Sequence, residues 1–178
     1  MTTLTIVLTG ACGGIGRALA VAFASAGHNL VLIGRNPDAL AALREGLERP
    51  RSHRYIVADL SSAEAITELC SDIADGSAID VLVNNAGTSS FGVFAETDDA
   101  VVEHMFQLNV LAPMRLCKGL MPLLLKSRNA AVINVGSGFG SIGFAGFTAY
   151  CASKFGLRGF TEALQRELAN ENIAIHYL

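Results

Sequence analysis

The sequence is poor in several features that mark particular classes of protein. It has no tryptophan, aromatic residues make up only 7% of it, and no apolar stretch approaches the length of a membrane-spanning helix. Because such a helix needs about 20 consecutive apolar residues, the sequence excludes one. The scattered cysteines described next indicate a cytoplasmic protein.

Metal ligands and disulfide partners are also sparse. The four cysteines are Cys12, Cys70, Cys117 and Cys151, and the four histidines are His28, His53, His104 and His176. Neither set has the spacing of a metal site, and the cysteines lack the density of a secreted disulfide scaffold. We expect reduced thiols, no bound metal, and histidines that serve as surface or strand residues without a chemical role.

Neither sign of charge dominates the sequence. It contains 13 Lys and Arg against 16 Asp and Glu, which gives a net charge of −3. Without a basic excess there is no electrostatic basis for binding nucleic acid or an anionic membrane surface. Small molecules are the expected partners.

Hydrophobic residues, at 51%, and glycine, with 18 residues, are abundant in this chain of 178 residues, a length that suits one domain over residues 1–178. Short apolar runs rich in β-branched residues alternate with segments of helical composition. The predicted strands are 4–8, 29–33, 55–58, 79–83, 131–135 and 173–178; the predicted helices are 17–26, 37–48, one ending near 74, 98–126 and 150–169. This alternation predicts an α/β fold with a doubly wound parallel sheet.

The first predicted strand leads into a glycine-rich loop and then a helix. Residues 9–16 have the sequence TGACGGIG. In this order of elements, glycines let the backbone approach a pyrophosphate, and the free amides at the helix start face it. A dinucleotide site is therefore predicted at Gly10, Cys12, Gly13, Gly14, Ile15 and Gly16, with a purely structural turn as the alternative.

Charged residues follow the second and third predicted strands. In a dinucleotide fold the end of the second strand reaches the adenosine ribose, where an acid would bond the 2′-hydroxyl. Here Gly34 is followed by Arg35, whose guanidinium suits a 2′-phosphate. This favours NADP(H) over NAD(H), unless Arg35 is only a solvated loop charge. Asp59 either contacts the adenine or, like Ser61, caps the next helix.

Polar side chains interrupt the apolar pattern further along the chain. Asn84 and Asn85 follow the fourth predicted strand, as turn formers or as the lining of a cofactor cleft. Asn109 lies in an apolar helical segment and needs hydrogen-bond partners, and Pro113 should bend that helix. Ser137 follows the fifth strand, at the edge where ligands bind in open α/β sheets.

Tyr150 and Lys154 are four residues apart in the last predicted helix. This spacing places them on one helical face, where the cation favours the phenolate form of the tyrosine. The pair is a candidate proton donor and acceptor, although the spacing alone also occurs by chance. Nearby, Phe139, Phe144 and Phe147 indicate an apolar wall and a lipophilic substrate, or packing against a neighbouring subunit.

Together these residues closely resemble the classical short-chain dehydrogenase/reductase family over nearly the whole chain. Residues 9–16 are similar to its cofactor loop, and Asn84-Asn85-Ala86-Gly87 to its sheet-stabilising motif. Asn109, Ser137, Tyr150 and Lys154 fall where the family carries its catalytic tetrad. Gly10, Gly13 and Gly16 also fit the extended branch of nucleotide-sugar epimerases, but the Asn-Asn-Ala-Gly motif and the short spacings favour the classical branch.

The resemblance implies a Rossmann-fold oxidoreductase that transfers a hydride between NADP(H) and a carbonyl or secondary alcohol. Tyr150 would be the acid/base, Lys154 would support it and hold the nicotinamide ribose, Ser137 would bind the substrate oxygen, and Asn109 would anchor a relay water. The implied cofactor contacts are the six loop residues above with Arg35, Asp59, Leu60, Asn85, Ala86, Gly87, Tyr150 and Lys154.

The resemblance further implies a homodimer or homotetramer that pairs the helices carrying Asn109 and Tyr150. The apolar residues on the second of these helices are Phe155, Leu157, Phe160 and Leu164, and periodicity places most of them in the domain core. The family's Pro-Gly motif, substrate loop and last strand do not follow the sixth strand, so we expect the C-terminal part of the family fold to be missing. The competing hypothesis is a non-catalytic NADP(H)-binding or interaction protein on the same scaffold.

Overall fold

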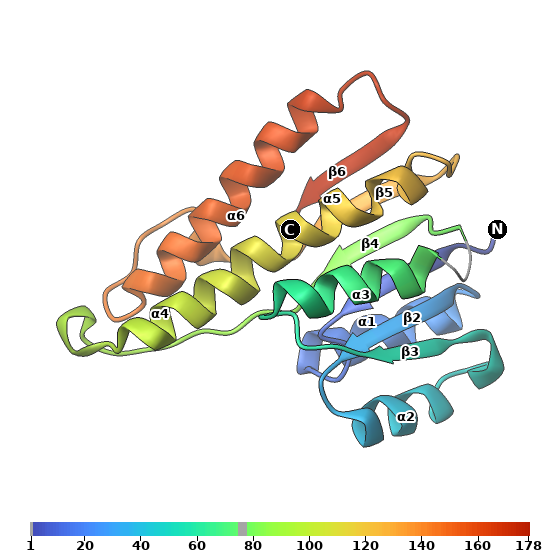
Figure 1. Cartoon of the computed structure of the whole chain (residues 1–178), viewed down its shortest axis with the longest axis horizontal. Helices are drawn as coiled ribbons and strands as arrows, with labels where there is room; N and C mark the ends of the chain where they lie inside the picture. The colour runs from blue at the N-terminus through green and yellow to red at the C-terminus, as the bar shows by residue number, and fades with distance from the viewer. Residues whose placement is uncertain (1, 75–77) are drawn as a thin grey trace.

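The computed structural model describes residues 2–74 and 78–178, and a parallel sheet lies at its centre (Figure 1). Across these residues, six strands pair in the order β3-β2-β1-β4-β5-β6. They are β1 (Thr5–Thr9), β2 (Asn29–Gly34), β3 (Arg54–Val57), β4 (Val81–Asn84), β5 (Ala130–Asn134) and β6 (Ile173–Tyr177). All five pairings are parallel, which confirms the predicted α/β fold.

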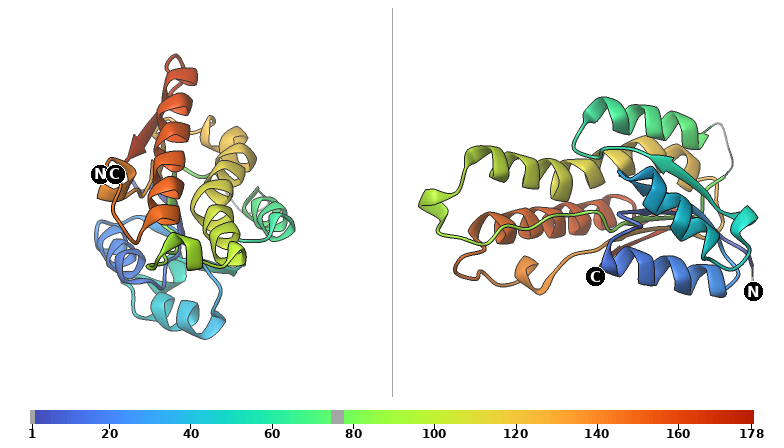
Figure 2. Two further views of the ribbon diagram at one scale, coloured as in Figure 1. Left: turned by 90° about the vertical axis from the view of Figure 1, so that its left-hand side faces the viewer. Right: turned by 90° about the horizontal axis from the view of Figure 1, so that it is seen from below.

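Helices connect the strands and cover both faces of the sheet (Figure 2). They are α1 (Gly14–Ser25), α2 (Pro37–Glu45), α3 (Ala63–Ala74), α4 (Asp99–Phe106), α5 (Ala112–Leu124) and α6 (Thr148–Glu167). Short 3-10 turns form η1 (Pro50–Ser52), η2 (Phe94–Glu96) and η4 (Gly138–Gly140), and η3 (Gln107–Leu111) is a π-helical turn.

Two buried clusters hold the layers together. On one face of the sheet, Leu8 packs with Leu40 and other residues of α1 and α2. On the opposite face, Val7 packs with Leu116 and other residues of α3, α5 and α6. Successive side chains of a strand point to opposite faces, so adjacent positions of β1 enter different cores. This explains why the central strands β1, β2 and β4 are almost entirely apolar in the sequence.

The long helix predicted over residues 98–126 is divided into α4 and α5. The interruption is the π turn η3, which precedes Pro113 and contains Asn109. Pro113 follows in the first turn of α5 and has no N–H to donate, while the Ala112 amide before it bonds the Gln107 carbonyl five residues back. The i→i−4 ladder is therefore interrupted at this point.

Asp59 or Ser61 was predicted to cap the start of α3, but the capping residue is Ser62. Ser62 Oγ accepts the Ala65 amide at 3.2 Å and caps the helix. Asp59 Oδ1 instead accepts the Ser61 amide at 3.0 Å and the Ser61 hydroxyl at 2.8 Å. Asp59 and Ser61 thus close a turn of their own just before the helix begins.

The strands all end at one edge of the sheet, on the left in Figure 1. From the central β1, the chain builds β2 and β3 outward on one side and β4, β5 and β6 on the other. Ligands of open α/β sheets bind where the strand order reverses, here between β1 and β4, outside the carboxyl ends of the strands. The glycine loop after β1 and the residues directly after β4 meet there.

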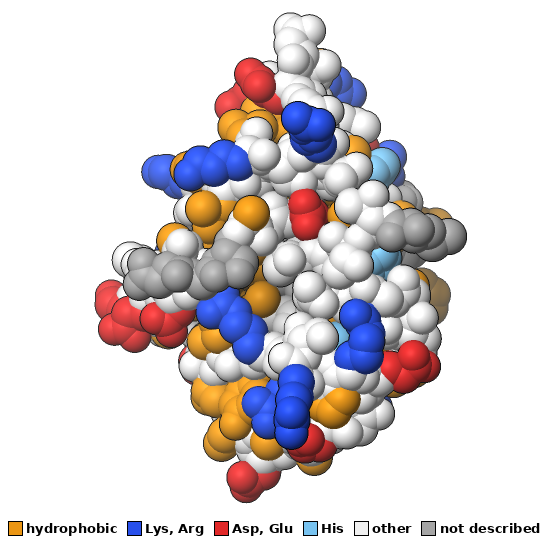
Figure 3. Space-filling model, turned by 90° about the vertical axis from the view of Figure 1, so that its right-hand side faces the viewer, with side chains coloured by type: hydrophobic (Ala, Val, Ile, Leu, Met, Phe, Trp, Pro, Cys, Tyr) orange, Lys and Arg blue, Asp and Glu red, His pale blue; other side chains and the backbone are white. Residues whose placement is uncertain are grey.

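The surface carries charges of both signs. On the face displayed in Figure 3, Lys and Arg side chains are interspersed with Asp and Glu and form no continuous basic surface. Within residues 2–74 and 78–178, none of the helices has the length and apolar character that crossing a bilayer requires.

Candidate active site

The glycine loop after β1 depends on two of its glycines for its shape. Gly10 has a φ of 63°, in the left-handed region that glycine adopts without strain. A β-carbon on Gly16 would overlap the Gly10 carbonyl oxygen, whereas one on Gly14 would meet nothing within 4 Å. The conformation of the loop therefore requires glycine at positions 10 and 16. At position 14 the absence of a side chain leaves open space beside the loop.

Residues that follow β4 fix this loop from behind. Asn85 Nδ2 donates to the carbonyl oxygens of Thr9, at 3.0 Å, and Gly10, at 3.2 Å. Thr9 Oγ1 accepts the amides of Asn85, at 2.9 Å, and Ala86, at 3.0 Å, and donates to the Val83 carbonyl at 3.3 Å. The asparagine motif therefore joins β4 to the loop after β1.

Asn84, in contrast, belongs to the core. It lies in β4, is 2% exposed, and its Nδ2 donates to Asn134 Oδ1 at 2.8 Å. Asn134 Nδ2 in turn donates to Thr161 Oγ1 at 2.9 Å, and the Thr161 hydroxyl donates to the Leu157 carbonyl at 2.7 Å. This buried chain ties β4 and β5 to α6, so both roles considered for Asn84, turn former and cleft lining, are wrong.

A cavity of about 650 Å³ opens in front of the glycine loop. This volume is typical of small-molecule sites. Its lining includes all of the predicted cofactor contacts except Tyr150 and Lys154, namely Gly10, Cys12, Gly13, Gly14, Ile15, Gly16, Arg35, Asp59, Leu60, Asn85, Ala86 and Gly87. It also includes Gly34, Asn36, Ala58 and Leu108, which the sequence reasoning missed although each adjoins a residue singled out there.

The start of α1 gives this cavity a positive end. The first intrahelical bond runs from the Arg17 amide to the Gly13 carbonyl at 2.8 Å. The amides of Gly14, Ile15 and Gly16 therefore have no acceptor within the helix. The first turn of α1 carries no acidic side chain that would compete for them. Such a helix start favours an anion, because free amides and the helix dipole act together.

Arg35 and Asp59 are exposed at the rim of the cavity. Hydrogen bonds from the Ser61 amide and hydroxyl lower the pKa of Asp59, and the charge of Arg35 adds to that effect. Asp59 is therefore an ionised carboxylate at neutral pH. The rim thus presents one negative and one positive group.

Lys154 is a buried cation beside Tyr150. It is 6% exposed, and its Nζ donates to the Val135 carbonyl at 2.9 Å. Burial lowers the pKa of Lys154, because the charged form loses hydration. Nζ lies 5.8 Å from the centroid of the Tyr150 ring. The two residues predicted to share a helical face thus lie next to each other.

Asn109 is completely buried in the π turn, at 0% exposure, and its amide is satisfied. Oδ1 accepts the Thr88 amide at 2.8 Å, and Nδ2 donates to the Thr88 carbonyl at 2.8 Å and to Ser153 Oγ at 3.0 Å. The Ser153 hydroxyl donates to the Tyr150 carbonyl at 2.8 Å. Asn109 therefore connects the segment after β4 with the start of α6.

Gly87 joins this arrangement to the cavity. A β-carbon on Gly87 would lie 3.1 Å from Asn109 Oδ1 and 3.8 Å from Lys154 Nζ. Gly87 also lines the cavity. The cavity therefore ends beside both polar groups.

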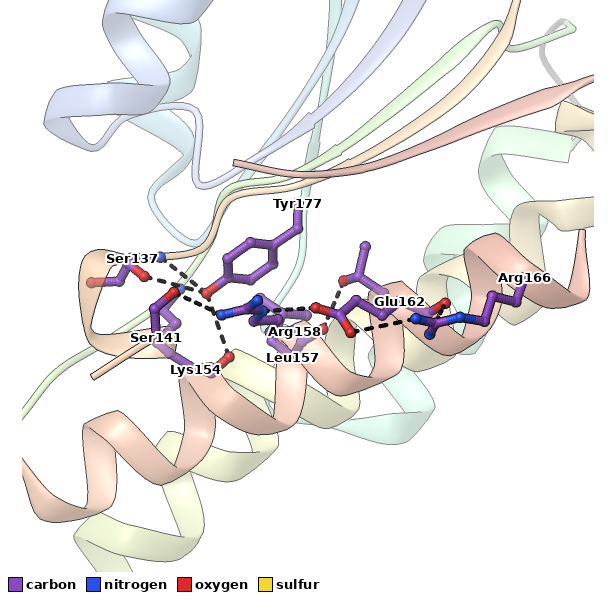
Figure 4. A network of polar contacts seen from close by, with 9 residues as sticks. Ser137, Ser141, Lys154, Leu157, Arg158, Glu162, Arg166 and Tyr177 are labelled. Carbon is purple, nitrogen blue, oxygen red and sulfur yellow. Dashed lines mark hydrogen bonds and ion pairs between the residues drawn. The ribbon is translucent and has the colours of Figure 1, made fainter. Parts of the chain in front are cut away.

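Ser137 lies on the loop between β5 and α6. Its Oγ accepts the Phe139 amide at 3.1 Å, which leaves the hydroxyl hydrogen available to another acceptor. Its backbone contacts the hydroxyl of Tyr177, at the end of β6, and Figure 4 shows Ser137, Lys154 and Tyr177 gathered there. The sequence reasoning assigned no role to Tyr177.

An aromatic cluster flanks Tyr150. The ring centroids of Phe139 and Phe147 each lie 6.1 Å from that of Tyr150. Phe144 stacks on Phe139 at 5.2 Å, and Phe91 lies 5.1 Å from Phe147. Phe91 is 72% exposed and Phe144 is 56% exposed. The predicted apolar wall is therefore present, with Phe91 as a member that the sequence reasoning missed.

The remaining candidates have structural roles. His53 is buried, contrary to the expectation for the histidines: Nδ1 accepts the Leu30 amide at 3.2 Å, and Nε2 lies 2.8 Å from the Glu48 carbonyl oxygen. Burial raises the pKa of Cys117 to about 12, which makes it an unreactive core thiol. No group of three or more metal-ligating side chains occurs in the described ranges 2–74 and 78–178.

Most of the apolar residues named on α6 lie in the core, as periodicity predicts. Leu157 is 1% exposed, and Phe160 and Leu164 pack against the core. Phe155, at 45% exposure, remains on the surface.

Comparison with known proteins identifies the family. The model of the short chain dehydrogenase family matches residues 4–178. The uncharacterized oxidoreductase YmfI of Bacillus subtilis is 33% identical over 175 residues, which cover 97% of this chain and 72% of that protein. The NADPH-dependent pterin aldehyde reductase of Arabidopsis thaliana is 32% identical over 177 residues, which cover 96% and 71% of the two chains.

Solved structures agree with this match. A short-chain dehydrogenase from Streptomyces avermitilis has a TM-score of 0.93 and 34% identity, over 99% of this chain and 64% of that one. A metagenomic short-chain oxidoreductase in complex with NADP has a TM-score of 0.89 and 30% identity, over 98% and 80%. This chain thus spans 64 to 80% of the length of these four relatives. It belongs to the short chain dehydrogenase family of oxidoreductases.

Proposed function

We propose that this chain binds NADP(H) in the cavity before the glycine loop and interconverts a carbonyl and a secondary alcohol, with Tyr150 as the acid/base. The main support for this proposal is the position of Gly87. This cavity-lining glycine faces both Asn109 Oδ1 and Lys154 Nζ, so a dinucleotide-sized cavity adjoins the Tyr150 and Lys154 pair.

The residues that line the cavity fit a dinucleotide phosphate. The free amides of Gly14, Ile15 and Gly16 are donors for the pyrophosphate, and the open space at Gly14 lets a phosphate approach the backbone. Any side chain at Gly14 would occupy that space. This chemistry suits a dinucleotide and offers no ligand set for a metal.

Arg35 supports NADP(H) as the preferred form. It follows β2, where a carboxylate would bond the 2′-hydroxyl of NAD(H), and its guanidinium matches a 2′-phosphate in charge and geometry. Two relatives agree with this choice in their own cofactors: the Arabidopsis reductase is NADPH-dependent, and the metagenomic oxidoreductase is in complex with NADP.

When bound, the nicotinamide cofactor supplies or accepts the hydride. Tyr150 would give a proton to the carbonyl oxygen during reduction and take one from the alcohol during oxidation. The Lys154 ammonium, which lies beside the Tyr150 ring, would hold the ribose hydroxyls and so fix the nicotinamide next to Tyr150.

Ser137 and Asn109 would support the proton transfer. Ser137 Oγ already accepts the Phe139 amide, so its hydrogen would go to the substrate oxygen, a contribution of ~2.7–4 kcal/mol for one such donor. Asn109 Oδ1 accepts one hydrogen bond and keeps a second lone pair, where a relay water toward Lys154 would bind.

The aromatic cluster supports a lipophilic substrate. The segment after β4, which carries Phe91, is joined to the loop of Phe144 and Phe147 by a hydrogen bond from the Gly92 amide to the Gly146 carbonyl at 2.9 Å. The two segments form one wall beside Tyr150. A ketone or aldehyde with an aromatic or bulky apolar group would bury that group against the wall.

We also infer a homodimer or homotetramer that pairs the α4–α5 and α6 helices, in which the exposed Phe155 would become covered. A cytoplasmic location accords with the four free cysteines.

The test uses the 178-residue chain, NADPH and a panel of aromatic and small polar carbonyl compounds, with the absorbance of the reduced cofactor as the readout. We expect turnover with the wild type and loss of turnover in Tyr150→Phe without loss of NADPH affinity. If NADPH binds but no carbonyl is reduced by either protein, the chain is instead a non-catalytic NADP(H)-binding protein.

A further inference from the structure

Tyr177 ends β6 and points toward the candidate active site. It shares a strand face with Ile173 and Ile175, because alternate side chains of a strand lie on the same face. Ile175 is part of the core beneath α6. The Tyr177 ring therefore lies between α6 and the loop after β5, as Figure 4 shows.

The ring fills a space that two glycines leave for it. A β-carbon on Gly136 would overlap Tyr177 Cζ, and a β-carbon on Gly140 would overlap the Tyr177 hydroxyl oxygen. Neither glycine has a positive φ, so the backbone conformation does not require glycine at either position. The Tyr177 ring is the reason that these positions must lack a side chain.

The Tyr177 hydroxyl joins the loop to the helix. It lies 3.3 Å from the Ser137 amide nitrogen, 3.4 Å from the Ser137 carbonyl oxygen and 3.5 Å from the Lys154 carbonyl oxygen. It can accept the amide hydrogen while donating its own hydrogen to one of the two carbonyls at a time. One hydroxyl thus contacts the backbone of two residues to which we assign catalytic roles.

Other bonds hold the loop on both sides of Ser137. Before it, Lys154 Nζ donates to the Val135 carbonyl at 2.9 Å, and the Gly136 amide donates to the Leu178 carbonyl at 2.6 Å. After it, the Gly140 amide donates to the Ser137 carbonyl at 2.9 Å, and Arg158 Nη1 on α6 donates to Ser141 Oγ at 2.9 Å. The Tyr177 hydroxyl is the side-chain partner of the Ser137 amide. Tyr177 is therefore the contact through which β6 fixes the Ser137 backbone, in addition to the bonds within the η4 turn.

We propose that Tyr177 is a positioning residue, which sets the placement of Ser137 relative to the Lys154 turn of α6. This inference rests on the proposed function, because it assigns to Tyr177 the alignment of that same site. Tyr177 acts through Ser137 and has no contact with the cofactor cavity, whose lining includes neither Ser137 nor Tyr177. Its loss should therefore affect turnover and leave cofactor binding unchanged.

Tyr177→Phe tests this with the least disturbance, because it keeps the ring and removes the hydroxyl. We expect kcat to fall about 3- to 10-fold, the effect of losing one neutral hydrogen bond. The KM and Kd for NADPH should not change. Tyr55→Phe is the matched control: it removes the same atom from a tyrosine on β3 that packs on Arg44, and kcat should stay at the wild-type value.

Hydrogen exchange of the peptide covering residues 135–141 gives a second readout that needs no turnover. We expect faster exchange there in Tyr177→Phe and no change in Tyr55→Phe. If the wild-type chain has no activity, the proposed function fails, and faster exchange still supports the positioning of this loop by Tyr177. The proposal is overturned if kcat and exchange both equal those of the wild type, or if kcat and NADPH affinity fall together.

Discussion

Replacement of Gly16 by alanine should damage the fold and the cofactor site together. The added β-carbon would overlap the Gly10 carbonyl oxygen and lie 2.9 Å from both Ala11 Cα and Asn85 Nδ2. Two of these atoms belong to the backbone and cannot rotate away, so the glycine loop must move. Such overpacking costs about 1–3 kcal/mol. The better helix propensity of alanine offsets at most ~1 kcal/mol of that cost.

Gly14→Ala is the matched variant, because Gly14 belongs to the same helix and lines the same cavity. Its β-carbon would meet nothing within 4 Å, so the fold has no reason to change. Stability should stay constant or rise by up to ~1 kcal/mol. NADPH affinity should nevertheless fall, because the new methyl group takes up space in front of the loop.

Gly159→Ala measures the propensity effect alone. Gly159 lies in α6, away from the cavity, and an added β-carbon meets nothing within 4 Å. We expect it to gain up to ~1 kcal/mol in stability and to bind NADPH as the wild type does. Urea unfolding and titration of NADPH fluorescence measure both quantities for all three variants. If Gly16→Ala matches Gly14→Ala in stability, the close approach described for the loop is wrong.

Two further predictions concern the charge of Arg35 at the cavity rim and the ionisation of the buried Cys117 thiol. Arg35→Asp should lower NADPH affinity about tenfold or more, the loss of at least one charge-assisted hydrogen bond, and should leave NADH affinity little changed. Parallel titrations decide this, and an equal loss for both cofactors would contradict the role of Arg35. Cys117 stays protonated in the native state up to about pH 12, whereas an ordinary thiol has a pKa of 9.0. Above pH 9.0 the native state therefore binds more protons than the unfolded chain, and stability should fall by up to ~1.4 kcal/mol per pH unit. Urea unfolding on both sides of that pH should show the extra slope in the wild type and its loss in Cys117→Ala; identical slopes would refute it.

The central strands β1, β2 and β4 could be predicted because burial on both faces makes them almost entirely apolar. The ends of the strands were predicted less accurately. Thr9 is polar in the sequence, yet it belongs to β1 and is 1% exposed, because its hydroxyl bonds the amides of Asn85 and Ala86. That partnership joins residues far apart in the chain, and no local pattern reveals it.

Helix boundaries failed for a similar reason. The loop glycines were expected to precede the first helix, but Gly14 and Gly16 form its first turn, where small residues allow close approach to the loop. The π turn at residues 107–111 surrounds an asparagine whose partners are Thr88 and Ser153. Apolar periodicity does not distinguish such a turn from a continuous helix.

The lining of the candidate cavity could be predicted where its residues form local motifs. The glycine loop and the residues after β4 line the cavity as expected, because strand ends of a parallel sheet meet at one edge. Phe91 and Tyr177 were missed because their contacts come from tertiary packing alone. The complementarity of Tyr177 with Gly136 and Gly140 is visible only when β6 lies beside the loop.

Transfer of deuterium from NADPH that carries deuterium at both C4 positions of the nicotinamide to an aromatic ketone tests the proposed chemistry most directly, with mass spectrometry of the alcohol product as the readout. We expect the wild-type chain to place deuterium on the carbinol carbon. Tyr150→Phe should bind NADPH normally and transfer deuterium about 10²–10⁴ times more slowly, the usual contribution of general acid catalysis. Equal rates for the two proteins, or an alcohol without deuterium, would contradict the assignment of Tyr150 as the acid/base of a hydride-transfer site.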